Sequence, residues 1–301
     1  MNPTQNPTQP KFNFKEFDAQ FPDDAACLDF IWKARYSNHV CECGKRDCFH
    51  RRSKRRAYQC AFCGAQIYPT AGTVFHKSPT SLKTWFFAMF LFAQSRNGVA
   101  AKELQRQLGV TYKCAWRIGH QIRALMDAGH SMFGGEVEAD ETYIGGVAKG
   151  KRGRGALNKT PVIGIVERRG GVVAKVMDSV TTVNAIKLIR SNVEQGTTVH
   201  TDEYPIYNYV GKLGFKHEVV NHGQKEYVRG RVHTNTIDGF WSQVKRSIDG
   251  THHGVSRKYL QNYVNEFSFR YSRRFYETPM FSLLAARAGL TPAKQAGETS
   301  I

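Results

Sequence analysis

The sequence predicts an α/β fold class, in which a domain of mixed sheet and helices follows two smaller modules. Three observations predict this arrangement. Five of the 7 cysteines lie between residues 41 and 63. A short amphipathic helix, a glycine and a second helix can be traced over residues 97–126, and strand and helix patterns alternate from residue 136 onwards. A chain of 301 residues is long enough for about two domains.

The composition favours a polyanionic partner. The formal net charge is +18, and aromatic residues make up 12% of a chain that is 41% hydrophobic, which excludes wholesale disorder. The basic residues concentrate in segments 45–56 and 149–159, and neither segment has the apolar face of a membrane-surface helix. Because Lys and Arg release counterions when they neutralise phosphates, nucleic acid is the favoured partner.

No targeting or membrane segment is visible. The start, MNPTQNPTQP, lacks a basic region followed by an apolar one, as a secretory signal would have. The longest apolar run, 85–93, is about half of the ~20 residues that a membrane span requires. We therefore expect a cytoplasmic protein with no membrane partner.

The cysteine cluster predicts a structural zinc site, because clustered cysteines in a cytosolic chain bind metal more often than they form disulfides. Cys60-Ala-Phe-Cys63-Gly64 is a regular zinc knuckle, and Cys43-Gly44 mirrors its second half. The fourth ligand is less determined, since Cys41 is separated from Cys43 by one residue only. The expected ligands are Cys41, Cys43, Cys60 and Cys63, with Cys48 as the alternative to Cys41 and His50 as a weaker candidate.

A helix-turn-helix pattern follows a buried helix over residues 82–93. Leu104 and Leu108 lie on one face of a short helix that Gly109 ends, and Thr111 can cap a second helix. In such motifs the second helix enters the major groove of DNA, although plain helical packing shows the same pattern. The expected DNA contacts on the second helix are Lys113, Arg117 and Arg123.

The second half of the chain predicts a mixed five-stranded sheet with helices. Strand patterns cover 136–146, 161–167 and 172–177, with a hairpin turn at 168–171. A helix at 182–193, a strand at 197–201, a helix at 204–213, a strand at 218–220 and a helix at 235–248 follow. This order of elements is the ribonuclease-H-like arrangement.

Carboxylates at defined places in this order predict a divalent-metal site. Asp140 lies in the first strand and Asp202 directly follows the fourth. Two Mg²⁺ ions about 4 Å apart, held by a few such oxygens, support in-line phosphoryl displacement. We expect Glu138 to share the face of Asp140, because strand side chains alternate, and Glu141 to point away.

Motifs along most of the chain resemble one known family. They are CAFCG, GTVFHKS, KTWFFA, LGVTYKCAW, EADETYIGG, TDEYPIY, HTNTIDGFWSQVKRSIDGTHHGVS and YLQNYVNEFSFRYSRR, between Cys41 and Arg274. In this order they resemble the DDE transposases of bacterial insertion sequences, in the group with an N-terminal zinc ribbon and an ISXO-type catalytic domain.

The resemblance implies a function and a partner. It implies binding to terminal inverted repeats, metal-dependent strand cleavage and strand transfer, with Mg²⁺ or Mn²⁺, two ions in the active site, and a homo-oligomer on DNA in the bacterial nucleoid. The alternative is a transposase-derived DNA-binding regulator without catalytic activity. A structure-specific nuclease on the same fold is a third, less favoured class.

The resemblance also assigns candidate catalytic residues. Asp140 corresponds to the family's first aspartate and Asp202 to its second. The third member is Asp238, where the family commonly has glutamate, or Asn235. Lys245, seven residues after Asp238, has the family's usual spacing for a basic residue that contacts DNA, which favours Asp238 over Asn235.

Further basic residues complete the expected DNA contacts, in the loop 149–155 and near the end of the family motifs; they are Lys151, Arg152, Arg270, Arg273 and Arg274. The expected domains are an N-terminal tail and helical segment (1–37), the zinc ribbon (38–76), the helix-turn-helix domain (77–130), the ribonuclease-H-like catalytic domain (131–275) and a C-terminal tail (276–301).

Overall fold

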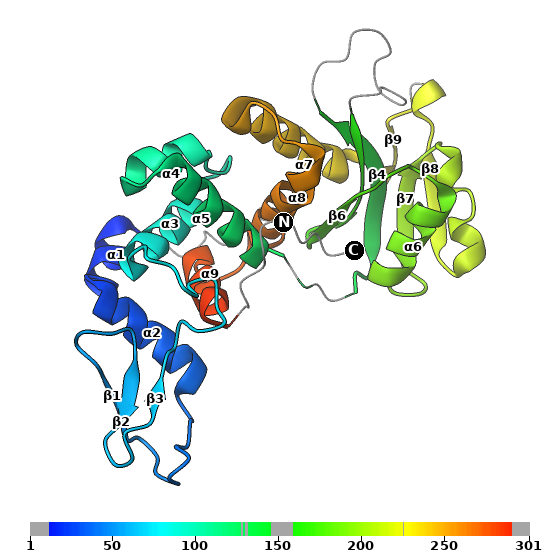
Figure 1. The fold of residues 1–301 in the computed structure, drawn as a ribbon. Helices are drawn as coiled ribbons and strands as arrows, with labels where there is room; N and C mark the ends of the chain where they lie inside the picture. The colour runs from blue at the N-terminus through cyan, green and yellow to red at the C-terminus, as the bar shows by residue number, and fades with distance from the viewer. Residues whose placement is uncertain (1–11, 128, 130–131, 146–158, 225, 291–301) are drawn as a thin grey trace, which may run out of the picture. The chain divides into compact units, whose positions relative to one another are not determined.

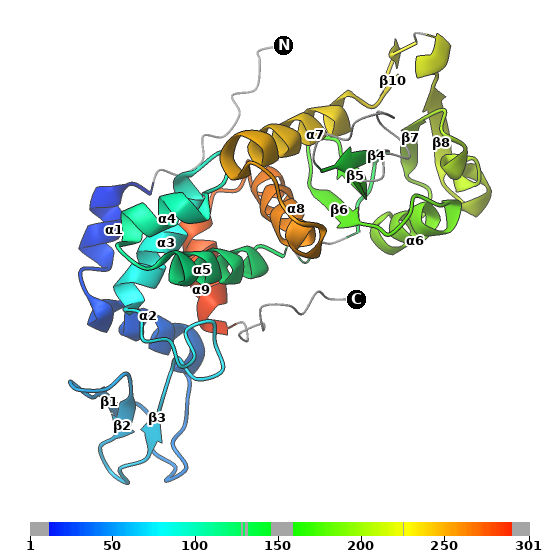
Figure 2. The same ribbon diagram turned by 45° about the horizontal axis from the view of Figure 1, so that its top comes forward.

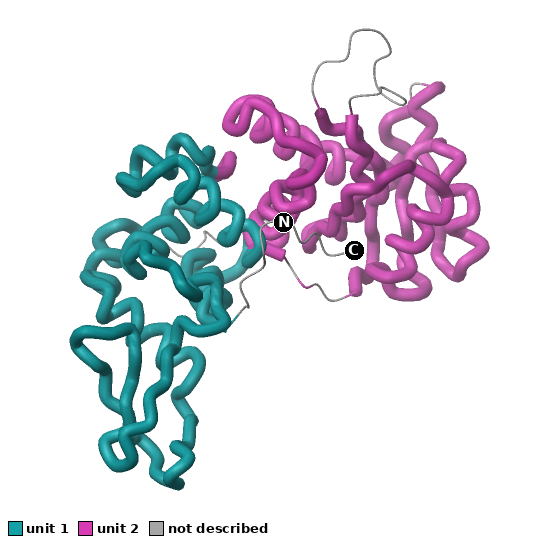
Figure 3. Tube along the Cα trace, viewed as in Figure 1, with its two compact units in different colours: residues 1–95, 99–125, 275–298 teal, residues 96–98, 126–274, 299–301 magenta. Residues whose placement is uncertain are grey.

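The computed structural model describes residues 12–127, 129, 132–145, 159–224 and 226–290. These residues form two compact units (Figure 3). Among the described residues, the first unit comprises 12–95, 99–125 and 275–290. The second comprises 96–98 and the segment 126–274. Among the described residues, no helix combines the length and the hydrophobicity that a membrane crossing requires.

The first unit packs a small three-stranded sheet and six helices (Figure 1). Its strands are β1 (Phe49–Arg51), β2 (Tyr58–Cys60) and β3 (Gln66–Ile67), all antiparallel in that order. Its helices are α1 (Phe14–Gln20), α2 (Asp24–Tyr36), α3 (Leu82–Gln94), α4 (Ala101–Leu108), α5 (Tyr112–Leu125) and α9 (Met280–Leu290).

The segment 276–301, expected to be a tail, contains helix α9, which belongs to the core of the first unit. Phe281 is buried and its ring lies 5.5 Å from that of Phe21 and 5.6 Å from that of Phe17. Arg287 donates a hydrogen bond of 2.8 Å to the carbonyl of Leu125 at the end of α5. The expectation was wrong because these contacts join residues far apart in the sequence, which local patterns do not show.

The two helices of the expected helix-turn-helix are present, with the turn that the sequence indicated. Gly109 follows α4 with a φ of +64°, a left-handed conformation that glycine adopts without steric cost. The Thr111 hydroxyl accepts a hydrogen bond of 3.3 Å from the Cys114 amide and so caps α5. Ala115, Ile118 and Ile122 are buried, so this face of α5 packs into the unit.

The second unit is built on one mixed sheet of five strands in the order β6-β5-β4-β7-β8. The strands are β4 (Glu136–Ile144), β5 (Thr160–Glu167), β6 (Val172–Val176), β7 (Thr198–Asp202) and β8 (Lys216–Val220). Strand β5 is antiparallel to its neighbours β4 and β6, whereas β7 runs parallel to both β4 and β8. This topology confirms the predicted ribonuclease-H-like fold.

Helices cover both faces of this sheet (Figure 2). Helix α6 (Thr182–Asn192) packs against the face to which Val137 and Ala139 of β4 point. Helices α7 (Asn235–Ser247) and α8 (Arg257–Ser272) cover the opposite face. Alternating residues of β4 therefore point to two separate cores, and Glu138 and Asp140 point to the side of α7.

The structure differs from the predicted elements in a few places. The segment 204–213 forms two 3₁₀ helices, Pro205–Tyr207 and Val210–Leu213, in place of one α-helix. Strand β8 starts two residues earlier than expected, and a short hairpin, β9 (Val228–Arg229) and β10 (Val232–His233), precedes α7. Pro205, which has no amide hydrogen, begins the first 3₁₀ helix, and Gly214, with a φ of +87°, ends the second.

We predict that Gly164→Ala destabilises the second unit. Gly164 pairs with Asp140 across β4 and β5, and a Cβ atom there would come within 2.6 Å of Cζ2 of Trp241. Overpacking of this kind costs about 1–3 kcal/mol. The matched control is Gly239→Ala on α7, where nothing lies within 4 Å of the added Cβ. Urea unfolding followed by circular dichroism should show a loss for Gly164→Ala only, and equal effects of the two substitutions would contradict the packing described.

Candidate active site and metal-binding ribbon

Three carboxylates meet where the adjacent parallel strands β4 and β7 come together. Asp140 and Glu141 lie in β4, and Asp202 is the last residue of β7. One oxygen of each residue lies within 4.8 Å of the others. The structure thus brings together the two aspartates that the sequence analysis selected.

The environment of Asp140 suits a cation. Its Oδ2 accepts a hydrogen bond of 3.0 Å from the indole nitrogen of Trp241, which fixes the orientation of the carboxylate. Burial raises the pKa of Asp140 well above its usual value, and the negative charges of Glu141, Asp202 and Asp238 raise this pKa further. A bound cation would remove this repulsion, and an oxygen-only donor set is the type that Mg²⁺ and Mn²⁺ prefer.

Glu141 takes part in this cluster, which the sequence analysis did not anticipate. Strand alternation does place it on the face opposite Asp140, where the buried Tyr207 hydroxyl donates a 3.3 Å hydrogen bond to its Oε2. Its carboxylate nevertheless reaches the other two acids. Alternation predicts to which face of the sheet a side chain points. It does not predict that the long Glu141 side chain brings its carboxylate close to acids on a neighbouring strand.

The candidate third members lie on α7. Asp238 is exposed and accepts a hydrogen bond of 3.3 Å from the Thr234 hydroxyl. Partial desolvation raises its pKa, while the Thr234 hydroxyl, His222 and Lys245 lower it in part. Asp238 lies outside the group of oxygens within 4.8 Å, yet its charge acts on Asp140. Asn235 is the first residue of α7, and both Asn235 and Lys245 are exposed.

His222 is a further residue near the candidate site, and it was not among the predicted site residues because no sequence motif pointed to it. It lies in the loop after β8, and its charge acts on Asp238. Glu203, the residue after Asp202, accepts hydrogen bonds from the amides of His222 at 2.8 Å and Gly223 at 3.0 Å. This loop is therefore held close to the end of β7.

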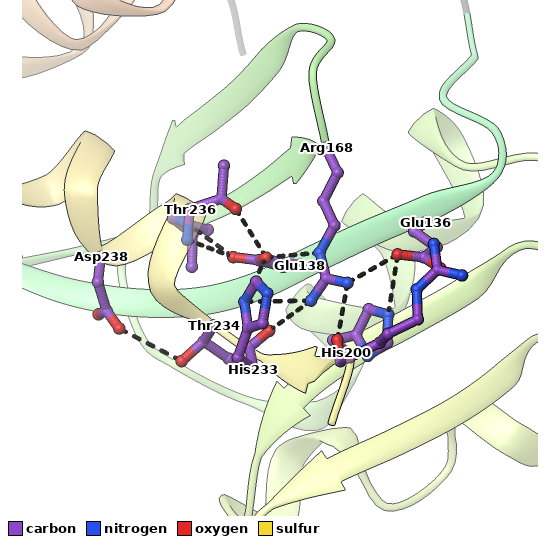
Figure 4. Close-up of polar contacts among 10 residues, drawn as sticks. Glu136, Glu138, Arg168, His200, His233, Thr234, Thr236 and Asp238 are labelled. Atoms are coloured by element: carbon purple, nitrogen blue, oxygen red, sulfur yellow. Dashed lines mark hydrogen bonds and ion pairs between the residues drawn. The ribbon is translucent and has the colours of Figure 1, made fainter. Parts of the chain in front are cut away.

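The side chain of Glu138 is fully buried, and Figure 4 shows it among its polar partners. It lies on the same face of β4 as Asp140, because both side chains are hydrogen-bonded to residues of α7. Its carboxylate contacts Arg168, which lies in the turn between β5 and β6, at 2.8 Å. It also accepts hydrogen bonds from the first turn of α7. Glu138 therefore joins the central strand to the helix that carries Asp238.

Four cysteine sulfurs in the small sheet of the first unit also form a candidate metal site. Those of Cys41, Cys43, Cys60 and Cys63 lie within 4.8 Å of one another, as the Cys₄ arrangement of a structural zinc ribbon requires. The amides of Cys63 and Phe62 lower the pKa of the Cys60 thiol to about 6, which favours the thiolate that binds metal. Cys48 is outside this group, although its sulfur lies 3.4 Å from that of Cys60.

Tight turns place both cysteine pairs. Gly44 and Gly64 have φ values of +80° and +75°, and their amides donate to the carbonyls of Cys41 and Cys60 at 2.7 and 3.1 Å. The turn closed by Gly44 spans three residues and the turn closed by Gly64 spans four, so the shorter turn accommodates the single-residue gap between Cys41 and Cys43. The mirrored Cys-Gly pairs were the sequence signal for this arrangement.

The expected DNA contacts divide into exposed and buried residues. Lys113 and Arg117 are exposed on α5. Arg123 is buried and was wrongly assigned to DNA: its guanidinium donates to the carbonyl of Val99 at 2.9 Å and lies over the ring of Phe92. Arg270 was also wrongly assigned, because it is buried and pairs with Glu266 on α8 at 2.7 Å.

The remaining basic residues are less exposed than expected or lie outside the described part. Arg274 donates to the carbonyl of Gly170 at 2.9 Å and lies over the ring of Tyr271. Arg273 is half-buried, with its guanidinium 5.6 Å from the centre of the Phe269 ring. Lys151 and Arg152 lie outside the described residues.

Two solved structures are similar to this chain at low overall similarity. A chain of the simian T-cell lymphotropic virus intasome in complex with PP2A regulatory subunit B56 gamma is 15% identical, with a TM-score of 0.30, and the match covers 61% of this chain and 65% of that one. A chain of a pre-cleavage Mos1 transpososome is 11% identical, with a TM-score of 0.28, over 67% of this chain and 78% of that one.

Sequence comparisons are more specific. A protein of Halobacterium salinarum, described as an uncharacterized protein in transposable element ISH50, is 28% identical over 271 residues, which cover 83% of this chain and 91% of that protein. An uncharacterized transposase-like protein of Haemophilus influenzae is 24% identical over 97 residues, or 32% of this chain and 77% of that protein. Residues 132–272 match the ISXO2-like transposase domain. This match contains the whole carboxylate cluster, so the part of the chain that carries the candidate site is similar to the ISXO2-like transposase domain.

Proposed function

We propose that the protein binds the terminal inverted repeats of an insertion sequence and catalyses metal-dependent DNA strand cleavage and strand transfer. The observation that carries this proposal is the juxtaposition of Asp140 and Asp202 on adjacent strands of a ribonuclease-H-like sheet. Asp238, whose charge acts on Asp140 from α7, supports a third ligand there. Asn235 is the alternative third ligand.

We assign a separate role to each residue of the site. Asp140 and Asp202 would hold two divalent ions, and Trp241 would keep Asp140 in the orientation that binding needs. When bound, such ions activate the attacking water or 3′-hydroxyl and stabilise the leaving oxygen. Lys245 lies two helical turns from Asp238 on the same side of α7, so its ammonium would contact a phosphate of the strand in the site. Two transposon ends have to be joined, and we therefore propose a homo-oligomer on DNA.

Substitution of the acids tests the chemistry. Asp140→Asn and Asp202→Asn should each reduce cleavage of a duplex with a terminal repeat by at least about 100-fold in Mg²⁺, because metal-ion stabilisation of the transition state is worth several kcal/mol. Gel analysis of labelled products measures this. Asp238→Asn should reduce cleavage more than Asn235→Ala does, if Asp238 is the third ligand.

The control for these variants is Asp249→Asn, which removes an exposed carboxylate after the end of α7 and should leave cleavage within about twofold of the wild type. Cleavage that survives in Asp140→Asn would overturn the site. Tight repeat binding by a wild type that gives no product in either Mg²⁺ or Mn²⁺ would favour the DNA-binding regulator.

Metal analysis tests the ribbon. We expect about one zinc per chain, lost in a variant with both Cys60→Ser and Cys63→Ser, since structural zinc sites need all four ligands. Cys48→Ser is the matched control and should retain zinc, because its sulfur lies outside the group of four. Loss of zinc in Cys48→Ser but not in Cys41→Ser would show that the fourth ligand is Cys48.

The exposed basic residues of α5 should contact the repeat DNA. Lys113→Gln and Arg117→Gln are each expected to weaken binding and to reduce the slope of log K against log salt by about 1. Fluorescence anisotropy at several salt concentrations measures both effects. Lys187→Gln, on the exposed side of α6 in the other unit, is the control for charge alone. An equal change of slope in all three variants would contradict a role of α5 in recognition.

A further inference from the structure

Helix α7 starts without a cap of its own. Its N-cap residue, Thr234, makes no capping hydrogen bond with its side chain. The amides of Thr236 and Ile237 instead donate to Oε2 of Glu138, at 2.8 and 3.0 Å. A carboxylate from the central strand β4 thus satisfies the first turn of α7, where the positive end of the helix dipole also favours a negative charge.

The second oxygen of Glu138 is equally engaged (Figure 4). Oε1 accepts from the Thr236 hydroxyl at 2.8 Å and from Nε of Arg168 at 2.8 Å, and it lies 3.2 Å from Nδ1 of His233. Arg168 also donates to Glu136 at 2.7 Å and to the carbonyl of His233 at 3.0 Å. One fully buried carboxylate therefore holds the start of α7, and through Arg168 it holds the hairpin strand that leads into the helix.

Stability alone does not account for this arrangement. A buried ion pair is often no more stabilising than apolar residues of the same volume, because both charges lose their hydration. What the network provides is a defined geometry. Glu138 precedes Asp140 by two residues on the same face of β4, and Asp238 lies within the first turn of α7, directly after the amides that Glu138 binds.

We propose that Glu138 is a positioning residue that sets the location of Asp238 relative to Asp140. This role rests on the proposed function, in which both aspartates hold metal. Strand β4 then supplies one metal ligand directly and fixes another through the helix cap. Both oxygens of Glu138 already accept hydrogen bonds from protein donors, so its proposed role is to position Asp238 and not to bind metal itself.

A double-mutant cycle tests this role, with Mn²⁺ affinity measured by isothermal titration on the full-length protein. Glu138→Gln keeps the volume of the side chain but removes the charge that Arg168 and the helix start require. It should weaken Mn²⁺ binding by about 10–100-fold, the usual effect of removing a partner that orients a metal ligand. In an Asp238→Asn background, the same substitution should cost less than about threefold, because the residue being positioned no longer binds.

Glu136→Gln is the matched control. Glu136 lies on the same strand and pairs with the same arginine, but none of its hydrogen bonds goes to α7 in the described residues. This variant should bind Mn²⁺ within about twofold of the wild type. Thr236→Val removes only the hydroxyl donor and covers the case in which Glu138→Gln does not fold. Its Mn²⁺ affinity should fall by about 3–10-fold, again only while Asp238 is present.

The outcomes separate this role from the proposed function. A wild type that binds no Mn²⁺ would overturn the metal site and this role with it. A wild type that binds Mn²⁺, together with equal losses from Glu138→Gln with and without Asp238, would overturn the positioning role alone. Unchanged Mn²⁺ affinity in both Glu138→Gln and Thr236→Val would do the same, even if the melting temperature falls.

Discussion

The capping of α7 by the buried carboxylate of Glu138 is the interaction on which the geometry of the candidate site depends. Asp140 and Asp202 are fixed by the sheet, because β4 and β7 are hydrogen-bonded neighbours. Asp238 comes from a helix, and a helix can slide or tilt on a sheet unless a specific contact prevents it. The hydrogen bonds from Thr236 and Ile237 to Glu138 are such a contact at the start of α7, and the hydrogen bond from Trp241 to Asp140 is a second one further along the helix.

The clustered carboxylates are a local exception to the strongly basic character of the chain. A net charge of +18 suits a polyanion, but it does not indicate what happens to that polyanion. Burial, and then the negative charges of the acids gathered around Asp140, raise its pKa, so the ionised cluster is electrostatically unfavourable without a cation. Divalent ions would reconcile these acids with DNA phosphates in one site, and the position of the cluster within the segment that matches the ISXO2-like transposase domain supports that interpretation.

Local sequence patterns predicted most of the helices and strands. The features that were predicted wrongly depend on contacts between residues far apart in the sequence. Alternation and turn residues predicted β4 to β7 and the helix that carries Asp238, and the mirrored Cys-Gly pairs predicted the four clustered sulfurs. The burial of Arg123 could not be predicted, because it depends on the ring of Phe92 and the carbonyl of Val99, which lie on other elements. The place of Glu141 in the acid cluster likewise could not be predicted, because it depends on Asp202 at the end of the neighbouring strand β7.

Anomalous diffraction from crystals soaked in Mn²⁺ is the most direct test of the central claim, that Asp140, Asp202 and Asp238 form one metal site. We predict an anomalous peak within coordination distance of oxygens from both Asp140 and Asp202, with Asp238 as a further ligand. A well-ordered second unit at saturating Mn²⁺ with no peak between these residues, or with peaks only elsewhere, would contradict it.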